Sequence, residues 1–510
     1  MDKKSFLLIL NNKYKQSIII IPLQTSENHY ICKYKMKNLA FIIFLFWAVI
    51  ACSTDKGSKL FTGQGNMAGE ISYKSVILQS RLTQTDSLVD SDLPGISGFA
   101  KFELSKSKDF NSGFTSSWIE ALPANDFIIT TAIKNLDSDS RYYYRLIYGK
   151  DSINTTTGNT CSFRTLPGKE SNRIISFAVI TGMNYDKFYT GVGDLEKAYK
   201  GPDKELGFPA LKSIKEKNPD FIVFTGDNIY YDKIPIAKTQ KNMRQKWHKQ
   251  FIQPRFIELL ANIPAYWEKD DHDYRYNDCD TMPGAEPSSL LGINTFREQV
   301  PVTDPLNEDA VTYRTFRVNK DLQIWLPEGR DYRSPNSLPD GPDKSLWGRK
   351  QLIWLKETLL ESDAAFKILI SPTPMVGPDD AYKSDNHVNQ KGFRYEGDAF
   401  FNWLKKNDFS DKGFYMICGD RHWQYHSIHP FGFEEFSCGA LIDVNSRAGR
   451  LPGDPSSTDP DALIIQPYVQ SKENISGGFL LVEVKTIGNE PTLTFEFYNE
   501  HGDLLYNETK

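Results

Sequence analysis

Residues 221–230 read FIVFTGDNIY, a short apolar run that stops abruptly at Gly226 and Asp227. An uninterrupted apolar run of this length predicts a strand that is buried on both faces, as in the middle of an α/β sheet. Open α/β sheets hold their functional groups just beyond the carboxyl ends of such strands. The sequence therefore predicts a functional carboxylate at Asp227, with Tyr230 supplying a second oxygen nearby.

The overall composition is that of a large globular protein. The chain has 510 residues, a formal net charge of -5 and a pI of about 6.0. Two or three domains are therefore expected, and no basic surface indicates a nucleic-acid partner. None of the 6 cysteines forms a CxxC pair, which argues against a zinc ribbon or a thioredoxin-like motif.

Residues 36–52 read MKNLAFIIFLFWAVIAC, a pattern typical of a bacterial lipoprotein signal peptide. The apolar stretch ends in a lipobox-like motif, and its cysteine, Cys52, is the expected site of acylation. The alternative is a transmembrane anchor, but the run falls short of the roughly 20 residues that a span requires. We expect an exported lipoprotein whose acyl chains anchor it to a membrane, either on the periplasmic side or at the cell surface.

The remainder of the chain divides into segments of different character. Residues 1–35 are an extension upstream of the signal peptide, explained by a start codon assigned too early or by an unusually long n-region. Residues 53–67 form a tether, 68–167 a small fibronectin type III-like β-module, and 172–500 an α/β domain. The patterns predict strands at 71–79, 98–104, 126–133, 141–148, 174–180, 220–225, 324–326, 366–370, 414–418, 478–484 and 492–499, and helices at 208–217, 243–263, 348–360 and 397–405.

Polar clusters follow several of these predicted strands. Residues 270–273 read DDHD, and residues 419–422 read GDRH. Three carboxylates crowded into four positions repel one another unless a cation lies close to them. Strand-end carboxylates and imidazoles separated by helices are the parts from which a dinuclear metal site is built. Hard oxygen ligands with one or two imidazoles suit Ca²⁺, Mn²⁺, iron or Zn²⁺.

These motifs resemble those of the alkaline phosphatase D (PhoD-like) branch of the calcineurin-like metallophosphatases. The resemblance covers residues 68–500, and it rests on GDxxY, DDHD and GDRH together with EGRDYRS, WGxxQxxWL and FKI. It implies an α/β fold, namely a four-layer α/β/β/α sandwich that follows the fibronectin type III-like module. It also implies a metal-dependent phosphoester hydrolase that uses two or more metal ions.

The resemblance assigns roles to single residues. Asp227 would bridge two metals, and Tyr230 would bind the first of them. Asp271 stands where related phosphatases carry an asparagine ligand to the second metal, and His272 would contact phosphate or protonate the leaving oxygen. The other implied roles are metal binding by His387, Asp420 and His422, catalysis by Arg330 and Arg421, and substrate binding by Asn228 and Arg333.

Some of these residues have structural alternatives. His387 is equally compatible with a surface loop histidine, and Arg330 and Arg333 with partners in structural ion pairs. The chain also departs from the family pattern, because Thr181-Gly182 stands where the family carries Ser-Cys with the thiolate on iron. Three alternatives follow: Asn184 or Asp186 supplies an oxygen, a harder ion such as Ca²⁺ takes the first position, or the site holds one metal only.

The sequence thus predicts a phosphomonoesterase or phosphodiesterase that acts on a small-molecule or lipid phosphoester. One rival is a phosphodiesterase for lipid or polymer phosphates. The other is a catalytically degenerate surface lipoprotein that binds glycans or nutrients, which the missing cysteine supports. The intact residues Asp227, Asp271, Asp420 and His422 favour an enzyme, because a decayed site is expected to lose carboxylates that repel each other.

Overall fold

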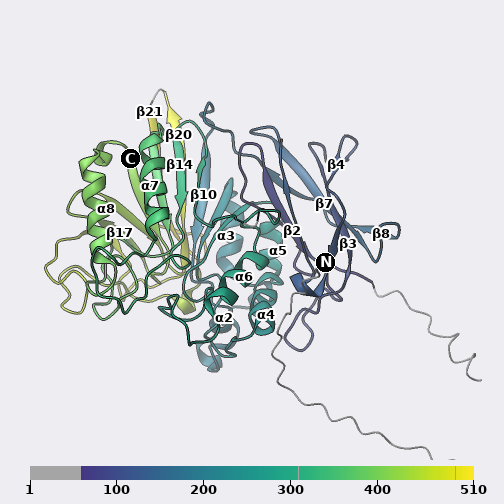
Figure 1. Ribbon diagram of the computed structural model, residues 1–510, viewed down its shortest axis with the longest axis horizontal. Coiled ribbons are helices and arrows are strands. Elements are labelled where there is room, and N and C mark those ends of the chain that lie inside the picture. Colours follow the sequence, from purple (N-terminus) through teal and green to yellow (C-terminus); the bar gives the residue numbers. More distant parts are fainter. Residues whose placement is uncertain (1–58, 308, 489) are drawn as a thin grey trace, which may run out of the picture. The chain divides into compact units, whose positions relative to one another are not determined.

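The computed structural model describes residues 59–307, 309–488 and 490–510, which are built on three sheets (Figure 1). The predicted extension at 1–35, the signal peptide at 36–52 and its lipidation site Cys52 lie outside these ranges. None of the helices in the described ranges has the length and apolarity that a membrane span requires.

The largest sheet has nine strands and contains the apolar run Phe221–Thr225 as β11. β10, β11 and β12 run parallel, so their carboxyl ends meet at one edge. The two strands predicted at 478–484 and 492–499 are present as β20 and β21, and they pair antiparallel. In sheet order the strands are β22 (Leu504–Thr509), β21 (Glu490–Asn499), β20 (Gly478–Ile487), β10 (Ile175–Ile180), β11 (Phe221–Thr225), β12 (Ala265–Glu268), β1 (Asn66–Gly69), β2 (Val76–Arg81) and β6 (Ile128–Ile133).

A second sheet has seven strands, of which β14, β15, β16 and β18 run parallel. A Cβ at Gly419, just after β16, would lie 2.5 Å from Thr225 Oγ1 at the end of β11. The carboxyl ends of the two sheets therefore meet. In sheet order the strands are β13 (Arg314–Arg317), β14 (Leu322–Leu326), β15 (Phe366–Ser371), β16 (Phe414–Cys418), β18 (Glu434–Cys438), β17 (Gln424–Ile428) and β19 (Ile465–Val469).

The third sheet comes from the amino-terminal part of the described chain. It consists of β3 (Gly98–Ser105), β4 (Phe114–Thr115), β5 (Ile119–Ala121), β7 (Arg141–Gly149), β8 (Thr155–Thr157) and β9 (Cys161–Arg164). The neighbouring strands β1, β2 and β6 belong to the nine-stranded sheet instead, where Gly69 pairs with Ala265. Because strands from both predicted domains share one sheet, the boundaries at 68–167 and 172–500 stay predictions.

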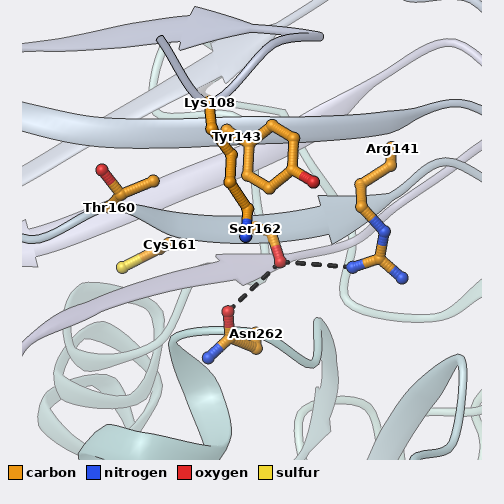
Figure 2. Close-up of a pocket in the computed structure, with 7 residues that line it drawn as sticks. All are labelled: Lys108, Arg141, Tyr143, Thr160, Cys161, Ser162 and Asn262. Atoms are coloured by element: carbon orange, nitrogen blue, oxygen red, sulfur yellow. Dashed lines mark hydrogen bonds between the residues drawn. The ribbon is translucent and has the colours of Figure 1, made fainter.

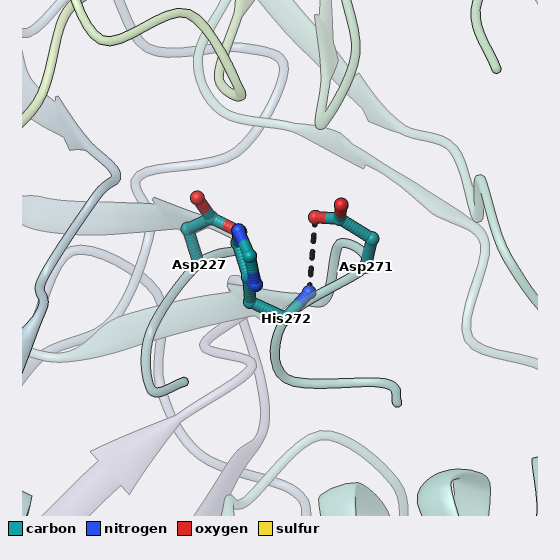
Figure 3. Close-up of side chains that lie close together, drawn as sticks. All are labelled: Asp227, Asp271 and His272. Atoms are coloured by element: carbon teal, nitrogen blue, oxygen red, sulfur yellow. Dashed lines mark hydrogen bonds between the residues drawn. The ribbon is translucent and has the colours of Figure 1, made fainter. Parts of the chain in front are cut away.

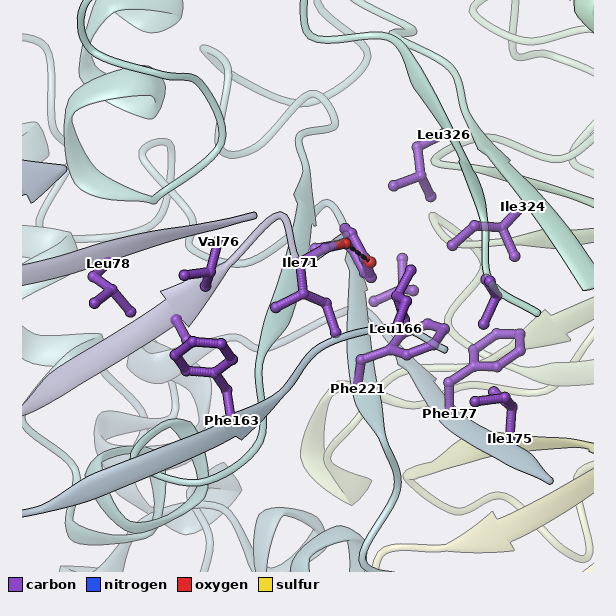
Figure 4. Packing of buried hydrophobic residues seen from close by; sticks show 14 of the residues in the cluster. Ile71, Val76, Leu78, Phe163, Leu166, Ile175, Phe177, Phe221, Ile324 and Leu326 are labelled. Carbon is purple, nitrogen blue, oxygen red and sulfur yellow. Dashed lines mark hydrogen bonds between the residues drawn. The ribbon is translucent and has the colours of Figure 1, made fainter. Parts of the chain in front are cut away.

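Side chains of β11 alternate between two apolar cores, as the continuous apolar run predicts. Phe221 and Val223 face a core that also holds Ile324 from the other large sheet, and Figure 4 shows part of this core. Ile222 and Phe224 face the opposite core, beneath helices. The two large sheets therefore pack against each other, with helices on their outer faces.

The helices α2 (Tyr185–Thr190), α3 (Pro209–Lys217), α4 (Gln240–Phe251), α5 (Pro254–Leu260) and α6 (Ser289–Gln299) cover the nine-stranded sheet. The helices α7 (Arg349–Glu361) and α8 (Arg394–Lys406) cover the seven-stranded sheet. The prediction of a single helix at 243–263 is wrong in one respect, because this segment forms two helices, α4 and α5. Pro254 has no amide hydrogen to continue a helix, and it begins the second one. Short 3₁₀ turns are η1 (Pro123–Asn125), η2 (Leu195–Lys197), η3 (Lys204–Leu206), η4 (Phe409–Asp411) and η5 (Asp443–Asn445).

Candidate metal centre

The turn after β11 requires a glycine. Gly226 has a φ of +82°, and a Cβ there would lie 2.5 Å from the backbone nitrogen of Asp270. Only a residue without a side chain lets the ends of β11 and β12 approach this closely. Asp227 and the carboxylates that follow β12 are thereby brought to the same edge of the sheet.

Asp227, Asp271 and His272 form a tight group of possible metal ligands (Figure 3). One ligand atom from each lies within 4.8 Å of the others, and all three side chains are buried. Tyr230 joins them, since its hydroxyl donates to Asp227 Oδ2 at 2.7 Å. His422 approaches from the second sheet, with Nε2 3.3 Å from the same Asp227 oxygen. The structure thus brings together five of the residues that the sequence singled out.

The chemistry of this group fits a bound cation. Asp227 Oδ1 is buried and has no hydrogen-bond partner among the residues that the structure describes, although an ionised carboxylate in such a place needs compensation. Burial raises the pKa of Asp227 to about 7; Asp271 and Asp273 add to this rise, and His272 opposes it. A buried carboxylate oxygen without a partner, close to further oxygen and imidazole ligands, suits a hard or borderline metal ion.

The carboxylates around His272 favour the protonated form of its imidazole. Burial alone would lower the pKa of His272, but the carboxylates of Asp271, Asp227 and Asp232 outweigh it and raise the pKa to about 9. Asp232 Oδ1 lies 2.8 Å from His272 Nδ1 and fixes the orientation of the ring. A positioned, protonated imidazole is the arrangement that a general acid requires.

Asp420 follows β16 and belongs to a second group of acidic side chains. Burial raises its pKa well above the usual range; Asp270, Asp385 and Asp271 add to the effect, and Lys383 opposes it. Sequence reasoning missed Lys383 and Asp385, because two charged residues in a long loop carry no distinctive pattern. Lys383 Nζ donates to Asp278 Oδ1 at 2.8 Å, whereas both Asp385 oxygens are buried and have no hydrogen-bond partner in the described ranges.

The two arginines predicted to be catalytic are held by carboxylates. Arg330 is completely buried, and its Nε donates to Asp270 Oδ1 at 2.7 Å. Arg421 pairs with Asp379 and with Asp420. The structure therefore favours the ion-pair alternative for Arg330. The ion pair of Arg421 with Asp420 places this arginine where it holds a candidate metal ligand in position.

Three other predicted residues have structural partners away from the Asp227 group. Asn228 Nδ2 donates to the Glu268 carbonyl oxygen at 2.8 Å and also to Asp273. The Nε of Arg333 donates to the Gly329 carbonyl oxygen at 2.8 Å. His387 Nε2 lies 3.0 Å from Glu396 Oε1, and the structure does not bring this imidazole to Asp227.

The position of the missing thiolate is filled by other groups. Gly182 has a φ of +69°, and a Cβ there would lie 2.9 Å from the Cα and Cβ of Ala440. Asn445 Nδ2 donates to the Gly182 carbonyl oxygen at 2.9 Å and to the Tyr230 hydroxyl at 3.0 Å. The residues here do not fit an iron–thiolate site. They do not supply the suggested replacements either, since Asn184 Oδ1 caps α2 and Asp186 pairs with Lys246.

We expect Gly182→Ala to lower the free energy of unfolding by about 2–3 kcal/mol, because backbone strain adds to a steric clash. Gly193→Ala is a matched control: its φ is +92°, but a Cβ there meets nothing within 4 Å. The control should cost only about 1 kcal/mol, the strain alone. Urea unfolding of both variants measures the difference, and equal losses would contradict the proposed crowding by Ala440.

The fold and this group of carboxylates and imidazoles at the edge of the sheet fit a metal-dependent phosphoesterase. Residues 177–441 match the model of the PhoD-like phosphatases, and residues 48–167 match the model of that family's N-terminal domain. The chain belongs to the PhoD-like phosphatase family.

Two solved structures resemble most of the chain. One, described as the structure of PhoD, has a TM-score of 0.66 and 16% identity, and the match covers 87% of this chain and 88% of that one. The purple acid phosphatase PPD1 from seeds of yellow lupin (Lupinus luteus) has a TM-score of 0.56 and 11% identity, with coverage of 89% and 74%. At such identities the likeness establishes the mixed α/β fold alone. Comparison with curated proteins gave no match.

Proposed function

We propose that this centre hydrolyses phosphate esters, both monoesters and diesters, with metal ions held by Asp227, Asp271, Asp420 and His422. The observation that carries the proposal is the orphaned Asp227 oxygen within a buried group of ligand atoms that lie within 4.8 Å of one another. Such a group costs free energy unless a cation binds it. Two metal ions are compatible with the number of donors, and their identity is open among Ca²⁺, Mn²⁺, Zn²⁺ and iron without a thiolate.

The residues of the chain have distinct parts in this reaction. A metal ion held here would lower the pKa of a bound water and neutralise charge on the ester. His272 is the candidate general acid: it gives its proton to the departing ester oxygen while Asp232 holds the ring. Tyr230 fixes Asp227 through its hydroxyl, and Asn445 in turn fixes Tyr230.

Cations near His422 support an anionic substrate. Burial and the neighbouring Lys233 and Arg447 lower the pKa of Lys187, a half-buried lysine in α2. Within the described ranges no carboxylate lies at ion-pair distance from Lys187, whereas Lys233 pairs with Asp232 and Arg447 with Asp380. The backbone N–H of Arg447 donates to the His422 carbonyl oxygen at 2.9 Å. Lys187 is therefore available to a negatively charged ester.

We expect Lys187→Met to raise KM for a phosphate ester about fivefold and to leave kcat within about twofold. A charge near the bound ester contributes on the order of 1 kcal/mol to binding the substrate and the transition state alike. Steady-state kinetics on p-nitrophenyl phosphate and its bis-ester measure both constants. Lys212→Met is the control, because Lys212 is 65% exposed and pairs with Glu216 on α3. An unchanged KM in Lys187→Met would contradict the role of Lys187.

The comparison of the two model esters also tests the proposed function itself. Hydrolysis of the bis-ester at a rate similar to the monoester would favour the variant of the proposal in which the enzyme acts on lipid or polymer phosphodiesters. If neither ester is hydrolysed by protein that contains bound metal, the function as a hydrolase is wrong. That outcome would favour the degenerate binding protein.

We further propose that the amino-terminal part is a fibronectin type III-like module and that acylation of Cys52 anchors the exported protein to a membrane. The lipobox-like sequence at 36–52 supports the anchor, and the antiparallel strands β3, β7 and β9 support the module. Cell fractionation tests the anchor. Cys52→Ser should move the protein from the membrane fraction to the soluble fraction, and an unchanged distribution would contradict lipidation.

A further inference from the structure

The outer face of the β7–β9 pair carries a hollow of about 470 Å³ that has no part in the centre described above (Figure 2). Six of its seven lining residues belong to the amino-terminal part of the chain, and Asn262, in the turn between α5 and β12, closes one side. Its polar lining consists of Lys108, Arg141, Tyr143, Thr160, Ser162 and Asn262.

Two positive charges converge in this hollow. Figure 2 shows the Lys108 amine and the Arg141 guanidinium on either side of the Ser162 hydroxyl. Arg141 Nη1 donates to Ser162 Oγ at 3.3 Å, and Ser162 Oγ donates to Asn262 Oδ1 at 3.2 Å. Lys108 Nζ lies 5.5 Å from the centre of the Tyr143 ring. In the part of the chain that the structure describes, neither cation has a carboxylate within ion-pair distance.

The strand register makes this charge arrangement unfavourable without a ligand. Arg141 lies directly opposite Arg164 in the antiparallel pair of β7 and β9. Like charges at directly opposed positions destabilise a sheet. Arg164 pairs with Asp139, with Nε 2.9 Å from its carboxylate, but Arg141 has no such partner within the described part of the chain. An anion in the hollow would supply the missing counter-charge.

A second hollow of about 310 Å³ extends the first along the same face, and it shares Arg141, Ser162 and Asn262 with it. Its acidic side chains already have partners, since Asp220 pairs with Arg173 and Glu258 with Lys215. These carboxylates therefore do not neutralise Arg141. The combined groove is large enough for an anionic group that is attached to a larger molecule.

This groove is separate from the metal centre. Asn262 precedes β12, which begins at Ala265, whereas Asp271 follows the end of that strand at Glu268. The groove thus lies at the amino ends of the parallel strands and the metal centre at their carboxyl ends. A ligand here would not compete with the ester for Asp227.

We propose that the groove around Arg141 and Lys108 is a second binding site for a tetrahedral oxyanion, a phosphate or a sulfate group. The guanidinium offers paired N–H donors that match two oxygens of such a group, and the lysine supplies a point charge. The hydroxyls of Tyr143 and Thr160 are further donors at the wall. The source of the group is either a free anion or the phosphate of a lipid headgroup.

Titration calorimetry with inorganic phosphate tests the site. The protein is the mature chain with Asp227→Asn, freed of metal by dialysis, so that the metal centre does not contribute. We expect saturable binding that weakens at least about tenfold in Arg141→Gln, because a charge-assisted pair of hydrogen bonds is lost. The control is Lys74→Gln, which likewise removes one positive charge. Lys74 resembles Lys108 in lying near a tyrosine ring, with Nζ 5.1 Å from the ring centre, but it lies outside the groove. The affinity of this variant should stay within about twofold.

Two further measurements keep the proposal open to refutation. Thermal unfolding checks that Arg141→Gln stays folded, as expected for a side chain at an exposed position. When Arg141→Gln is introduced into the otherwise wild-type protein, the rate of ester hydrolysis should not change. Co-sedimentation with phosphatidylglycerol vesicles, against phosphatidylcholine, then identifies the source: binding that requires Arg141 assigns the lipid headgroup, and binding of phosphate alone assigns a free anion. Equal phosphate affinity in Arg141→Gln and the parent, or no binding of either probe, overturns the proposal.

Discussion

Replacing Asp227 by asparagine is expected to reduce phosphate ester hydrolysis by a factor of about a thousand or more while the protein stays folded. The substitution removes a negative charge and one ligand oxygen from the centre of the proposed metal site, where several kcal/mol of charge stabilisation are at stake. Tyr230 and His422 both contact the Asp227 oxygen that the change affects.

The metal-free variant should be at least as stable as the metal-free wild type. Burial raises the pKa of Asp227 to about 7, with Asp271 and Asp273 adding to the rise, so the neutral amide relieves an unfavourable charge. The free energy of unfolding of both proteins, measured in the presence of a chelator, therefore distinguishes loss of function from misfolding. A variant that is inactive because it is unfolded would not support the role of Asp227.

Asp408→Asn is a matched control for this change. Asp408 is exposed and adopts a φ of +57°, close to the +53° of Asp227, so any effect of asparagine on such a backbone appears in both variants. Asp408→Asn should leave hydrolysis unchanged. If purified Asp227→Asn, supplied with metals, kept more than about a tenth of the wild-type rate, the proposed metal bridge would be wrong.

Replacing Arg330 by methionine is expected to lower the free energy of unfolding by about 3–5 kcal/mol. The guanidinium is completely buried, where it pairs with Asp270 and donates to the Cys279 carbonyl oxygen at 2.9 Å. Its removal leaves Asp270 buried without its counter-charge. The effect should be visible as a large decrease in the midpoint of urea unfolding.

The loss should also depend on pH. Burial raises the pKa of Asp270 to about 7 even with Arg330 opposing it, so the folded-state pKa exceeds the unfolded value of about 3.9. A carboxyl whose pKa is raised by folding destabilises the protein increasingly as pH rises. Without Arg330 the pKa rises further, so the deficit of Arg330→Met should be larger at about pH 8 than at about pH 6.

Two controls accompany this variant. Asp270→Asn combined with Arg330→Met removes the orphaned charge and should recover part of the lost stability. Arg349→Met breaks an ion pair with Asp343 whose partners are 80% and 90% exposed, and it should cost at most about 1 kcal/mol. A loss below that value in Arg330→Met would show that the buried pair does not hold the site together.

The sequence was sufficient where the deciding interaction is local. The apolar run of β11 predicts that this strand is buried on both faces. Because the carboxyl ends of parallel strands meet at one edge of a sheet, Asp227 is then expected at that edge. The same reasoning places Asp271 and His272 after β12. The break at Pro254 was also visible in the sequence, but the apolar periodicity on both sides of it favoured one continuous helix.

The sequence was insufficient where partners come from distant segments. The absent thiolate is evident from Gly182, but its replacement by Asn445 depends on a contact between residues 263 positions apart. The partner of His387 is likewise determined by the fold of a long loop, and nothing in the sequence indicated Glu396 of α8 as that partner. Membership of β1 in the nine-stranded sheet depends on a pairing with β12 that no periodicity encodes.

The central claim is that hydrolysis depends on metal ions bound at Asp227. The most direct measurement removes all metal from the protein with a chelator and then titrates Mn²⁺, Ca²⁺ or Zn²⁺ back, recording bound metal and p-nitrophenyl phosphate hydrolysis in the same samples. The account predicts no hydrolysis without metal, recovery in proportion to the metal bound, and weaker binding in Asp227→Asn. Full hydrolysis by protein without detectable metal would contradict it.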